Sequence, residues 1–298
     1  MTAPVDLRGF GDIRYSVQVD ILRPPAYWDL GMVSDVVVDE QDRLWVASRR
    51  SHPISIWSTN GAFLGSWGEG EFVEVHHLAP AEGGIWIVDD QLHVVRRYEH
   101  DGTLLHQLGR TGSAVATVTH LGQNGGPFNM PTGVALGRGG EIFVSDGYGN
   151  RQVHRFSANG NLERSWGRSG VGPGEFAVVH SVTVDGTDRV LICDRENNRV
   201  QVFDYDGGFV AEWTHLRGPA DTAIDSAGLV YVIEQGDPLN DQPNGISVLT
   251  MAGEVVGRWH AEAAGSMVGG HGLALDSAGN VYIADLVGRR VVKLVRER

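Results

Sequence analysis

The sequence predicts an all-β fold, a β-propeller of six blades, on three observations. A phrase of four short strands separated by turns recurs along the 298 residues, with 40 to 56 residues between successive starts. The strands are rich in β-branched and aromatic residues and are bounded by Gly, Asn or Asp. Glycine is frequent, at 41 residues, and no stretch keeps a 3.6-residue apolar period for three turns, so a helical fold is not expected.

The repeats are aligned on the residue at the start of each first strand, which we call the anchor of that blade. The six anchors are Ser34, His76, Thr132, His180, Ala220 and His271. The sixth repeat ends after three strands, at Val295, and the alternating stretch Arg14–Asp20 is predicted to complete it. Such a ring, closed by an N-terminal strand that joins the last blade, leaves no exposed sheet edge at the seam. We expect one domain covering residues 1–298.

Composition and charge exclude several classes of protein. Lys and Arg number 24 against 37 Asp and Glu, a net charge of −13, which argues against nucleic-acid and anionic-membrane partners. No run approaches the roughly 20 apolar residues of a membrane helix, and the N-terminus has no apolar signal region. The single cysteine, Cys193, cannot form an internal disulfide. We expect a cytoplasmic protein with a small-molecule substrate, and no oligomeric state is predicted.

The anchors of blades two, four and six are histidines: His76, His180 and His271. Alternate blades of a six-fold ring are related by a three-fold rotation, so these imidazoles are predicted to converge in the channel. Three neutral histidines with an open fourth position form a catalytic zinc site. The alternative is three separate histidines bonded to water or backbone. The neighbouring His77 is expected on the other strand face, in a structural role.

The ends of the second strands are predicted to lie on the same face as the histidines. Arg49 and Arg195 come fifteen residues after their anchors, and Tyr148 comes sixteen after its own. An arginine binds a carboxylate through its forked guanidinium, and a tyrosine near a divalent cation serves as a base. The alternative is that the arginines pair with loop carboxylates such as Glu196 and that Tyr148 packs in a loop. The aspartates at offset fourteen are expected to fix turns; they are Asp146, Asp194 and Asp285.

Several of these motifs resemble a known family. Repeats that end as SDGYGNRQVHRF and CDRENNRVQVF resemble NHL repeats. Four further segments resemble the peptidyl-α-hydroxyglycine α-amidating lyases, and the resemblance runs from about residue 30 to the C-terminus. They are SRRSHPISIW (48–57), VHHLA (75–79), MPTGVAL with VSDGYGNR (130–151), and FAVVHSVTV with ICDRENNRVQVF (176–203).

The resemblance implies a six-bladed propeller that splits a peptidyl carbinolamide into an amide and glyoxylate. It implies that His76, His180 and His271 hold zinc near the substrate hydroxyl. Tyr148 would help to remove the hydroxyl proton, and Arg49 or Arg195 would hold the carboxylate. These are the same six residues to which the repeat offsets point.

The chain also departs from the family. An aspartate that helps to bind a structural calcium in the family is replaced here by Gly272, which argues against a calcium site. A methionine two residues before the third zinc ligand is Gly269, which predicts an opened or reshaped pocket. The long loops 109–129 and 235–245 are expected on the metal face, as a partial lid or as ordinary insertions. GRSGVGPGEF (167–176) is interpreted as an inter-blade turn, because it lacks the Lys and Ser/Thr of a phosphate loop.

The function predicted first is a metal-dependent lyase or hydratase that acts on a small molecule bearing hydroxyl and carboxylate groups. Zinc is expected, although three imidazoles also suit nickel, iron or manganese. A lactonase-type metal hydrolase is one alternative, but such sites usually rely on carboxylate and Asn ligands around calcium. A non-enzymatic NHL module that binds protein is the other, and it leaves the alternate-blade histidines unexplained.

Overall fold

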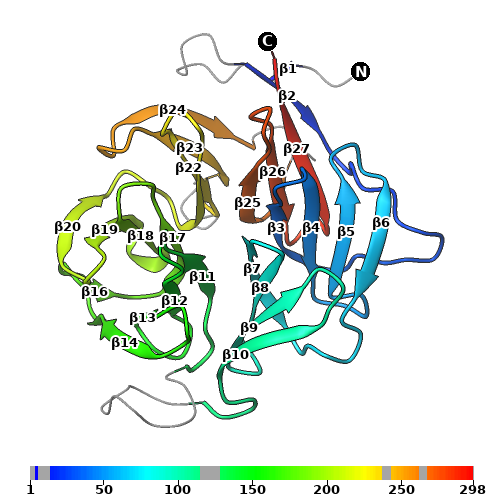
Figure 1. The fold of residues 1–298 in the computed structure, drawn as a ribbon. Helices are drawn as coiled ribbons and strands as arrows, with labels where there is room; N and C mark the ends of the chain where they lie inside the picture. Colours follow the sequence, from blue (N-terminus) through cyan, green and yellow to red (C-terminus); the bar gives the residue numbers. More distant parts are fainter. Residues whose placement is uncertain (1–3, 6–13, 115–127, 237–242, 262–266, 298) are drawn as a thin grey trace. The chain divides into compact units, whose positions relative to one another are not determined.

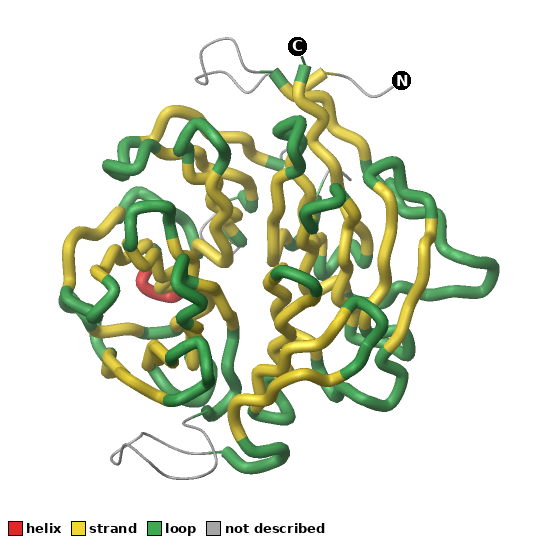
Figure 2. Tube along the Cα trace, in the orientation of Figure 1, coloured by secondary structure: helices red, strands yellow, loops and turns green. Residues whose placement is uncertain are grey.

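A computed structural model describes residues 4–5, 14–114, 128–236, 243–261 and 267–297. In these residues the chain is almost entirely strand and turn, and the helical element is a single 3-10 turn, η1 (Arg195–Asn197) (Figure 2). The described residues contain six antiparallel sheets of four or five strands. Five of these sheets have four consecutive strands each. The sixth has five strands, which come from both ends of the described chain (Figure 1). The predicted all-β propeller of six blades is confirmed. No helix in the described residues has the length and apolar character needed to cross a membrane.

The chain divides into two compact units, each with three consecutive blades. We call residues 70–214 the central unit and residues 1–69 with 215–298 the terminal unit. The strands of the central unit are β7 (Val75–Ala81), β8 (Gly84–Asp89), β9 (Val94–Glu99) and β10 (Leu104–Gly109) in blade two, β11 (Gly133–Leu136), β12 (Ile142–Asp146), β13 (Gln152–Phe156) and β14 (Leu162–Trp166) in blade three, and β17 (Val179–Val184), β18 (Arg189–Asp194), β19 (Arg199–Asp204) and β20 (Phe209–Trp213) in blade four. A short parallel pair, β15 (Arg168–Ser169) with β16 (Glu175–Phe176), lies between blades three and four in sequence.

Apolar side chains between neighbouring blades form the core of the central unit. One cluster joins blades two and three through residues such as Val88 and Val144, and another joins blades three and four through Phe143 and Ile192. The second strand of each blade is therefore covered on both faces, and β8, β12 and β18 are buried along almost their whole length. This explains why these strands are continuous apolar runs without alternation. The outermost strands β10, β14 and β20 are largely exposed.

The terminal unit contains blades one, five and six. Its strands are β3 (Val33–Val38), β4 (Arg43–Ser48), β5 (Ile54–Ser58) and β6 (Phe63–Trp67) in blade one, β21 (Pro219–Ile224), β22 (Val230–Glu234), β23 (Gly245–Leu249) and β24 (Val255–His260) in blade five, and β25 (Gly270–Leu275), β26 (Val281–Asp285), β27 (Arg290–Arg296), β2 (Tyr15–Gln18) and β1 (Pro4–Val5) in blade six. Strand β2 pairs antiparallel with β27, from Tyr15 opposite Arg296 to Gln18 opposite Lys293 (Figure 1). The predicted completion of the last blade by an N-terminal strand is confirmed.

A register irregularity marks the anchor of five blades. In the ladder between first and second strands, pairing skips one residue each time, and the skipped residue is Ser34, His76, His180, Ala220 or His271. In blade three, β11 begins at Gly133, directly after the anchor Thr132. A β-bulge leaves its extra residue outside the ladder and redirects its side chain. The anchors are therefore set apart from their strands by backbone geometry.

Candidate active site

His76 and His180 lie together in the central unit. Both are buried, their ring centroids are 5.1 Å apart, and their ligand nitrogens lie within 4.8 Å of each other. His271, in the terminal unit, is also buried. Imidazole nitrogens of buried histidines are the usual ligands of a transition metal, so each of the three residues could serve as a ligand.

Hydrogen bonds to backbone carbonyls set the tautomer of two of these histidines. Nδ1 of His76 lies 2.6 Å from the carbonyl oxygen of Thr132, and Nδ1 of His271 lies 2.7 Å from that of Ser34. In both cases the carbonyl belongs to the anchor of the next blade. A carbonyl only accepts, so a neutral ring carries its proton on Nδ1 and keeps the Nε2 lone pair available. An Nδ1–H held by a backbone carbonyl is the usual support of a metal-binding histidine.

The hydroxyl of Tyr148 lies between the two histidines of the central unit. Its oxygen is 2.9 Å from Nε2 of His76 and 3.1 Å from Nε2 of His180. A phenol has one proton and can donate to only one of these nitrogens at a time. The Nε2 lone pair of His76 can accept the one proton of this hydroxyl, and the same lone pair would serve as a metal ligand.

The loop that carries Tyr148 is fixed by the residues around it. A Cβ at Gly147 would lie 1.7 Å from the carbonyl oxygen of Val179, so the chain can pass here only as glycine. Asp146 accepts from the Asn150 amide at 2.6 Å and from the backbone N–H of residue 129 at 2.9 Å. The sequence D-G-Y-G-N thus holds the phenol of Tyr148 in a fixed position. The prediction that Asp146 fixes a turn is confirmed, and Asp194 and Asp285 likewise accept from backbone N–H groups.

Arg195 lies beside Tyr148. Its guanidinium carbon is 5.8 Å from the centroid of the tyrosine ring, and its Nε donates to Glu196 at 2.9 Å. The alternative reading, an ion pair with Glu196, is therefore present in the structure. The Glu196 side chain is 56% exposed, whereas Arg195 is 17% exposed. Pairs with an exposed partner contribute little to stability, so the exchange of Glu196 for another carboxylate at Arg195 would cost little.

One backbone hydrogen bond shows that the three predicted catalytic residues occupy equivalent positions. The N–H of Arg49, of Tyr148 and of Arg195 each donates to the carbonyl two residues before the anchor of its own blade, at 2.9, 3.4 and 3.0 Å. The extra residue in blade three, Gly147, explains why Tyr148 has an offset of sixteen. Arg49 itself directly follows β4 in the terminal unit and is half-buried.

Asp90 occupies the equivalent backbone position in blade two, and the sequence analysis missed it. Its N–H donates to the carbonyl of Glu74, two residues before His76, at 3.3 Å, and its side chain is buried. Blade two is one residue shorter between its anchor and the turn-fixing acid Asp89, so the fixed offset of fifteen passed over Asp90. An alignment on the acid rather than on the anchor would have found it.

Two departures from the lyase family have local structural explanations. A Cβ at Gly272 would lie 2.0 Å from Oδ1 of Asp35, so the carboxylate of Asp35 occupies the space of a side chain there. A Cβ at Gly269 would lie 2.6 Å from Cγ2 of Val287, so Val287 fills the space that the missing methionine leaves. Val287 therefore covers the backbone two residues before His271.

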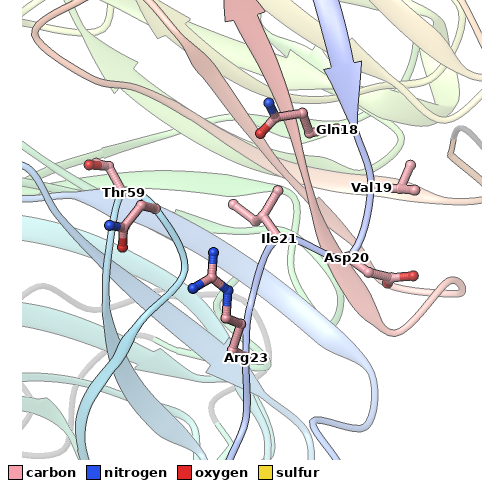
Figure 3. A pocket seen from close by; sticks show the side chains of 7 residues that line it. Gln18, Val19, Asp20, Ile21, Arg23 and Thr59 are labelled. Carbon is pink, nitrogen blue, oxygen red and sulfur yellow. The ribbon is translucent and has the colours of Figure 1, made fainter. Parts of the chain in front are cut away.

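The remaining predicted features are placed as follows. Segment 167–176 forms the β15–β16 pair and links blades three and four, so its reading as an inter-blade turn is confirmed. Most of loop 109–129 and the middle of loop 235–245 lie outside the described residues. A cavity of about 330 Å³ lies in the terminal unit, where the segment after β2 meets the turn of blade one (Figure 3). It is lined by Gln18, Val19, Asp20, Ile21, Arg23, Thr59 and Asn60, which include no predicted site residue.

Comparison with known proteins supports this class of fold. A family described as a 6-bladed beta-propeller matches residues 136–233. A gluconolactonase structure from Xanthomonas campestris superposes with a TM-score of 0.68 over 100% of this chain and 98% of that one. The two sequences are 13% identical, so this likeness concerns the fold alone.

Among sequence relatives, human NHL repeat-containing protein 3 is 28% identical over 75% of this chain and 67% of its own length. Rat peptidylglycine alpha-amidating monooxygenase is 31% identical over 67% of this chain and 24% of that protein. A probable peptidyl-alpha-hydroxyglycine alpha-amidating lyase of Caenorhabditis elegans is 30% identical over 61% of this chain and 51% of that protein. The chain thus spans about a quarter of the rat protein and half of the worm protein.

The protein is a six-bladed β-propeller. It is related to the NHL-repeat proteins and to the peptidyl-α-hydroxyglycine amidating lyases, as its motifs predict.

Proposed function

We propose that the protein is a metal-dependent lyase that cleaves α-hydroxyglycine derivatives or closely related carbinols that carry a carboxylate. The observation that carries this proposal is the hydroxyl of Tyr148, 2.9 and 3.1 Å from Nε2 of two buried histidines. The kinship with amidating lyases, at about 30% identity, supports the choice of reaction. A plain interaction module has no need for a half-buried phenol between two buried imidazoles.

The metal ligands in this proposal are His76, His180 and His271. Each of the three is skipped in the ladder of its first strand, and each is buried. His76 and His271 share the Nδ1–carbonyl bond that presents Nε2 as a ligand. The residues therefore suit a divalent transition metal, for which we propose zinc. When bound, such a metal would lower the pKa of a substrate hydroxyl.

The protein side chains supply the rest of the chemistry. In R–CO–NH–CH(OH)–COO⁻, Tyr148 acts as a base in its phenolate form and takes the hydroxyl proton as the C–O bond becomes a carbonyl. The C–N bond breaks with its electron pair on nitrogen, and Tyr148 returns the proton to that nitrogen. The products are R–CO–NH₂ and glyoxylate, so atoms and charge balance. Arg195 gives up its ion pair with Glu196 and holds the substrate carboxylate instead. Arg49, at the equivalent position of blade one, is the second candidate for this role.

We also propose a cytoplasmic location and a small-molecule substrate. The supporting observations are the single cysteine, Cys193, which is buried in β18, and the net charge of −13. Two other functions are kept as candidates. A lactonase-type hydrolase is suggested only by the shared fold, and a protein-binding role by the kinship with NHL repeat-containing protein 3.

Elemental analysis of the untagged protein tests the proposal first, with the His76/His180/His271 triple alanine variant measured beside it. We expect about one transition metal per chain in the wild type and none in the variant, with both folded by circular dichroism. The metal-loaded wild type is then assayed for glyoxylate release from N-benzoyl-α-hydroxyglycine. The lyase proposal is rejected if the wild type stays metal-free after reconstitution with zinc. It is also rejected if the metal-loaded protein releases no glyoxylate.

A further inference from the structure

The cavity of Figure 3 lies where the N-terminal segment passes from blade six to blade one, and we call it the seam cavity. Its volume of about 330 Å³ is in the range of small-molecule sites. One wall is segment 18–23, which begins at the end of β2, and the other is residues 59–60, in the turn between β5 and β6. Both walls belong to the terminal unit, and none of the lining residues is a candidate active-site residue.

Backbone contacts hold the two walls of the seam cavity together. The N–H of Arg23 donates to the carbonyl of Gly61 at 3.0 Å. A Cβ at Gly61 would lie 1.8 Å from the carbonyl oxygen of Ile21, so only glycine allows this close approach. Beneath the same turn, Nζ of Lys293 donates to the carbonyl of Thr59 at 3.1 Å. The walls are therefore fixed by the fold, and a ligand that enters between them has little backbone to order.

The seam cavity presents hydrogen-bond donors that the protein itself does not use. Within the part of the chain that the structure describes, nothing accepts from the guanidinium of Arg23 or from the side-chain amide of Gln18. Asn60 uses its side-chain oxygen inside its own turn, and its amide N–H group likewise has no acceptor among these residues. Figure 3 shows the side chains of Gln18, Ile21 and Arg23 extending toward the turn that carries Thr59. The cavity is thus suited to a ligand that supplies acceptors.

The charges of the lining favour a ligand with a single negative charge. Arg23 is the one cation among the described lining residues, and its planar fork matches a carboxylate. The lining also includes Asp20, whose side chain extends to the other side of the segment in Figure 3. A phosphate dianion is opposed by Asp20 and by the net charge of −13, and a monocarboxylate is opposed less. Ile21 adds apolar surface beside Arg23, which suits a short aliphatic chain.

We propose that the seam cavity binds a small aliphatic monocarboxylate, with its carboxylate on Arg23 and its chain against Ile21. The side-chain amides of Gln18 and Asn60 donate to the acceptor positions of the carboxylate that the guanidinium leaves open. The bound molecule touches both walls, so it ties segment 18–23 to blade one and stabilises the folded state. This inference does not rest on the proposed lyase function.

Hexanoate is the probe that tests the seam cavity, with acetate, hexylammonium and inorganic phosphate as comparison ligands. Binding to the full chain is measured by calorimetry, and the thermal midpoint is followed by circular dichroism. We expect hexanoate to bind with a Kd of about 1 mM and to raise the midpoint as its concentration increases. Acetate should bind about tenfold more weakly, because it lacks the chain that contacts Ile21. Hexylammonium and phosphate should show no saturable binding.

Variants at three arginines locate the bound carboxylate. Arg23→Gln removes the charge of an exposed side chain and keeps the backbone N–H that holds the wall, so it should fold and bind hexanoate at least tenfold more weakly. Arg14→Gln is the matched control, because Arg14 is also exposed, directly precedes β2 and does not line the cavity. This control should keep the wild-type affinity. Arg195→Gln, at the candidate active site, should keep it as well.

Three results would overturn the inference. The first is the absence of saturable hexanoate binding, and the second is an affinity that Arg23→Gln leaves unchanged. The third is binding of phosphate or hexylammonium as tight as that of hexanoate. If Arg195→Gln abolishes binding and Arg23→Gln does not, the carboxylate belongs to the candidate active site and the seam cavity is rejected as its site. Glyoxylate release by the Arg23→Gln variant should equal that of the wild type.

Discussion

The hydroxyl oxygen of Tyr148 lies 2.9 Å from Nε2 of His76, and the Nδ1 of the same ring is 2.6 Å from a backbone carbonyl. The backbone carbonyl thus fixes the imidazole at Nδ1, and Nε2 faces the hydroxyl of Tyr148. This hydrogen bond joins the proposed base to a proposed metal ligand. A substitution of either residue should therefore change the hydrogen bonding of the other.

Replacement of Tyr148 by phenylalanine should separate chemistry from metal binding. Tyr148→Phe removes the hydroxyl but keeps the ring that faces Arg195, so the metal should stay bound and the fold intact. Loss of a general base slows turnover by about 10²-fold or more. Steady-state kinetics on metal-quantified protein measure this effect. A rate equal to that of the wild type would remove Tyr148 from the mechanism.

His76 and His77 form a matched pair on strand β7. His76 is the residue that the ladder skips, whereas His77 pairs with Val88. We expect His76→Ala to lose metal and activity, and His77→Ala to keep both, as measured by elemental analysis and glyoxylate release. If the two variants lose metal equally, the bulge does not select the ligand.

The glycine before Tyr148 should be essential for both stability and activity. Gly147→Ala would bring a Cβ to 1.7 Å from the carbonyl oxygen of Val179, so the loop must shift and carry the phenol with it. We expect a loss of about 2 kcal/mol or more in unfolding free energy and a large loss of rate. Gly186→Ala, in a turn with no atom within 4 Å of the added carbon, is the control and should change stability by less than about 0.5 kcal/mol.

Glu234 should make the stability of the protein depend on pH. Burial raises the pKa of its carboxyl above the ordinary 4.5, although Arg258 at 4.0 Å and a hydrogen bond from Ser247 at 3.0 Å oppose this shift. The folded state binds this proton more tightly than the unfolded state does. The stability that this proton contributes is therefore fully present below about pH 4.5 and is lost as pH rises through the raised pKa.

Glu234→Gln keeps the shape of the side chain and removes the titration. The variant should gain stability relative to the wild type as pH rises from 4 to 8, as followed by chemical denaturation. A difference between the two proteins that stays constant over this range would show that the carboxyl of Glu234 does not titrate there.

The fold and much of the site could be predicted because the repeat itself encodes them. Six copies of one strand pattern fix the blades, and offsets of fifteen or sixteen residues from the anchors bring Arg49, Tyr148 and Arg195 to equivalent backbone positions. The bulges at the anchors could not be predicted, because a bulge is a property of the register between two strands and leaves no mark in one of them. Asp90 was missed because its blade is one residue shorter.

The contacts of Gly269 and Gly272 show a second limit of prediction. Each glycine lacks a side chain that the related family has, and the sequence alone does not say which residue lies beside it. In the structure the space belongs to Val287 and Asp35, which lie 18 and 237 residues away along the chain. Which side chain fills a gap depends on neighbouring strands, and a single sequence does not name it.

The hydrogen bond from His271 to the carbonyl of Ser34 spans 237 residues. Blade one is therefore made early in synthesis, but its partner in blade six is made more than 200 residues later, whereas the central unit is one continuous stretch. Contacts between distant segments form slowly because the closure of a long loop costs entropy. We expect residues 70–214 to acquire their structure first. The orientation of His271, and with it the complete set of proposed ligands, is then the last feature of the site to form during folding.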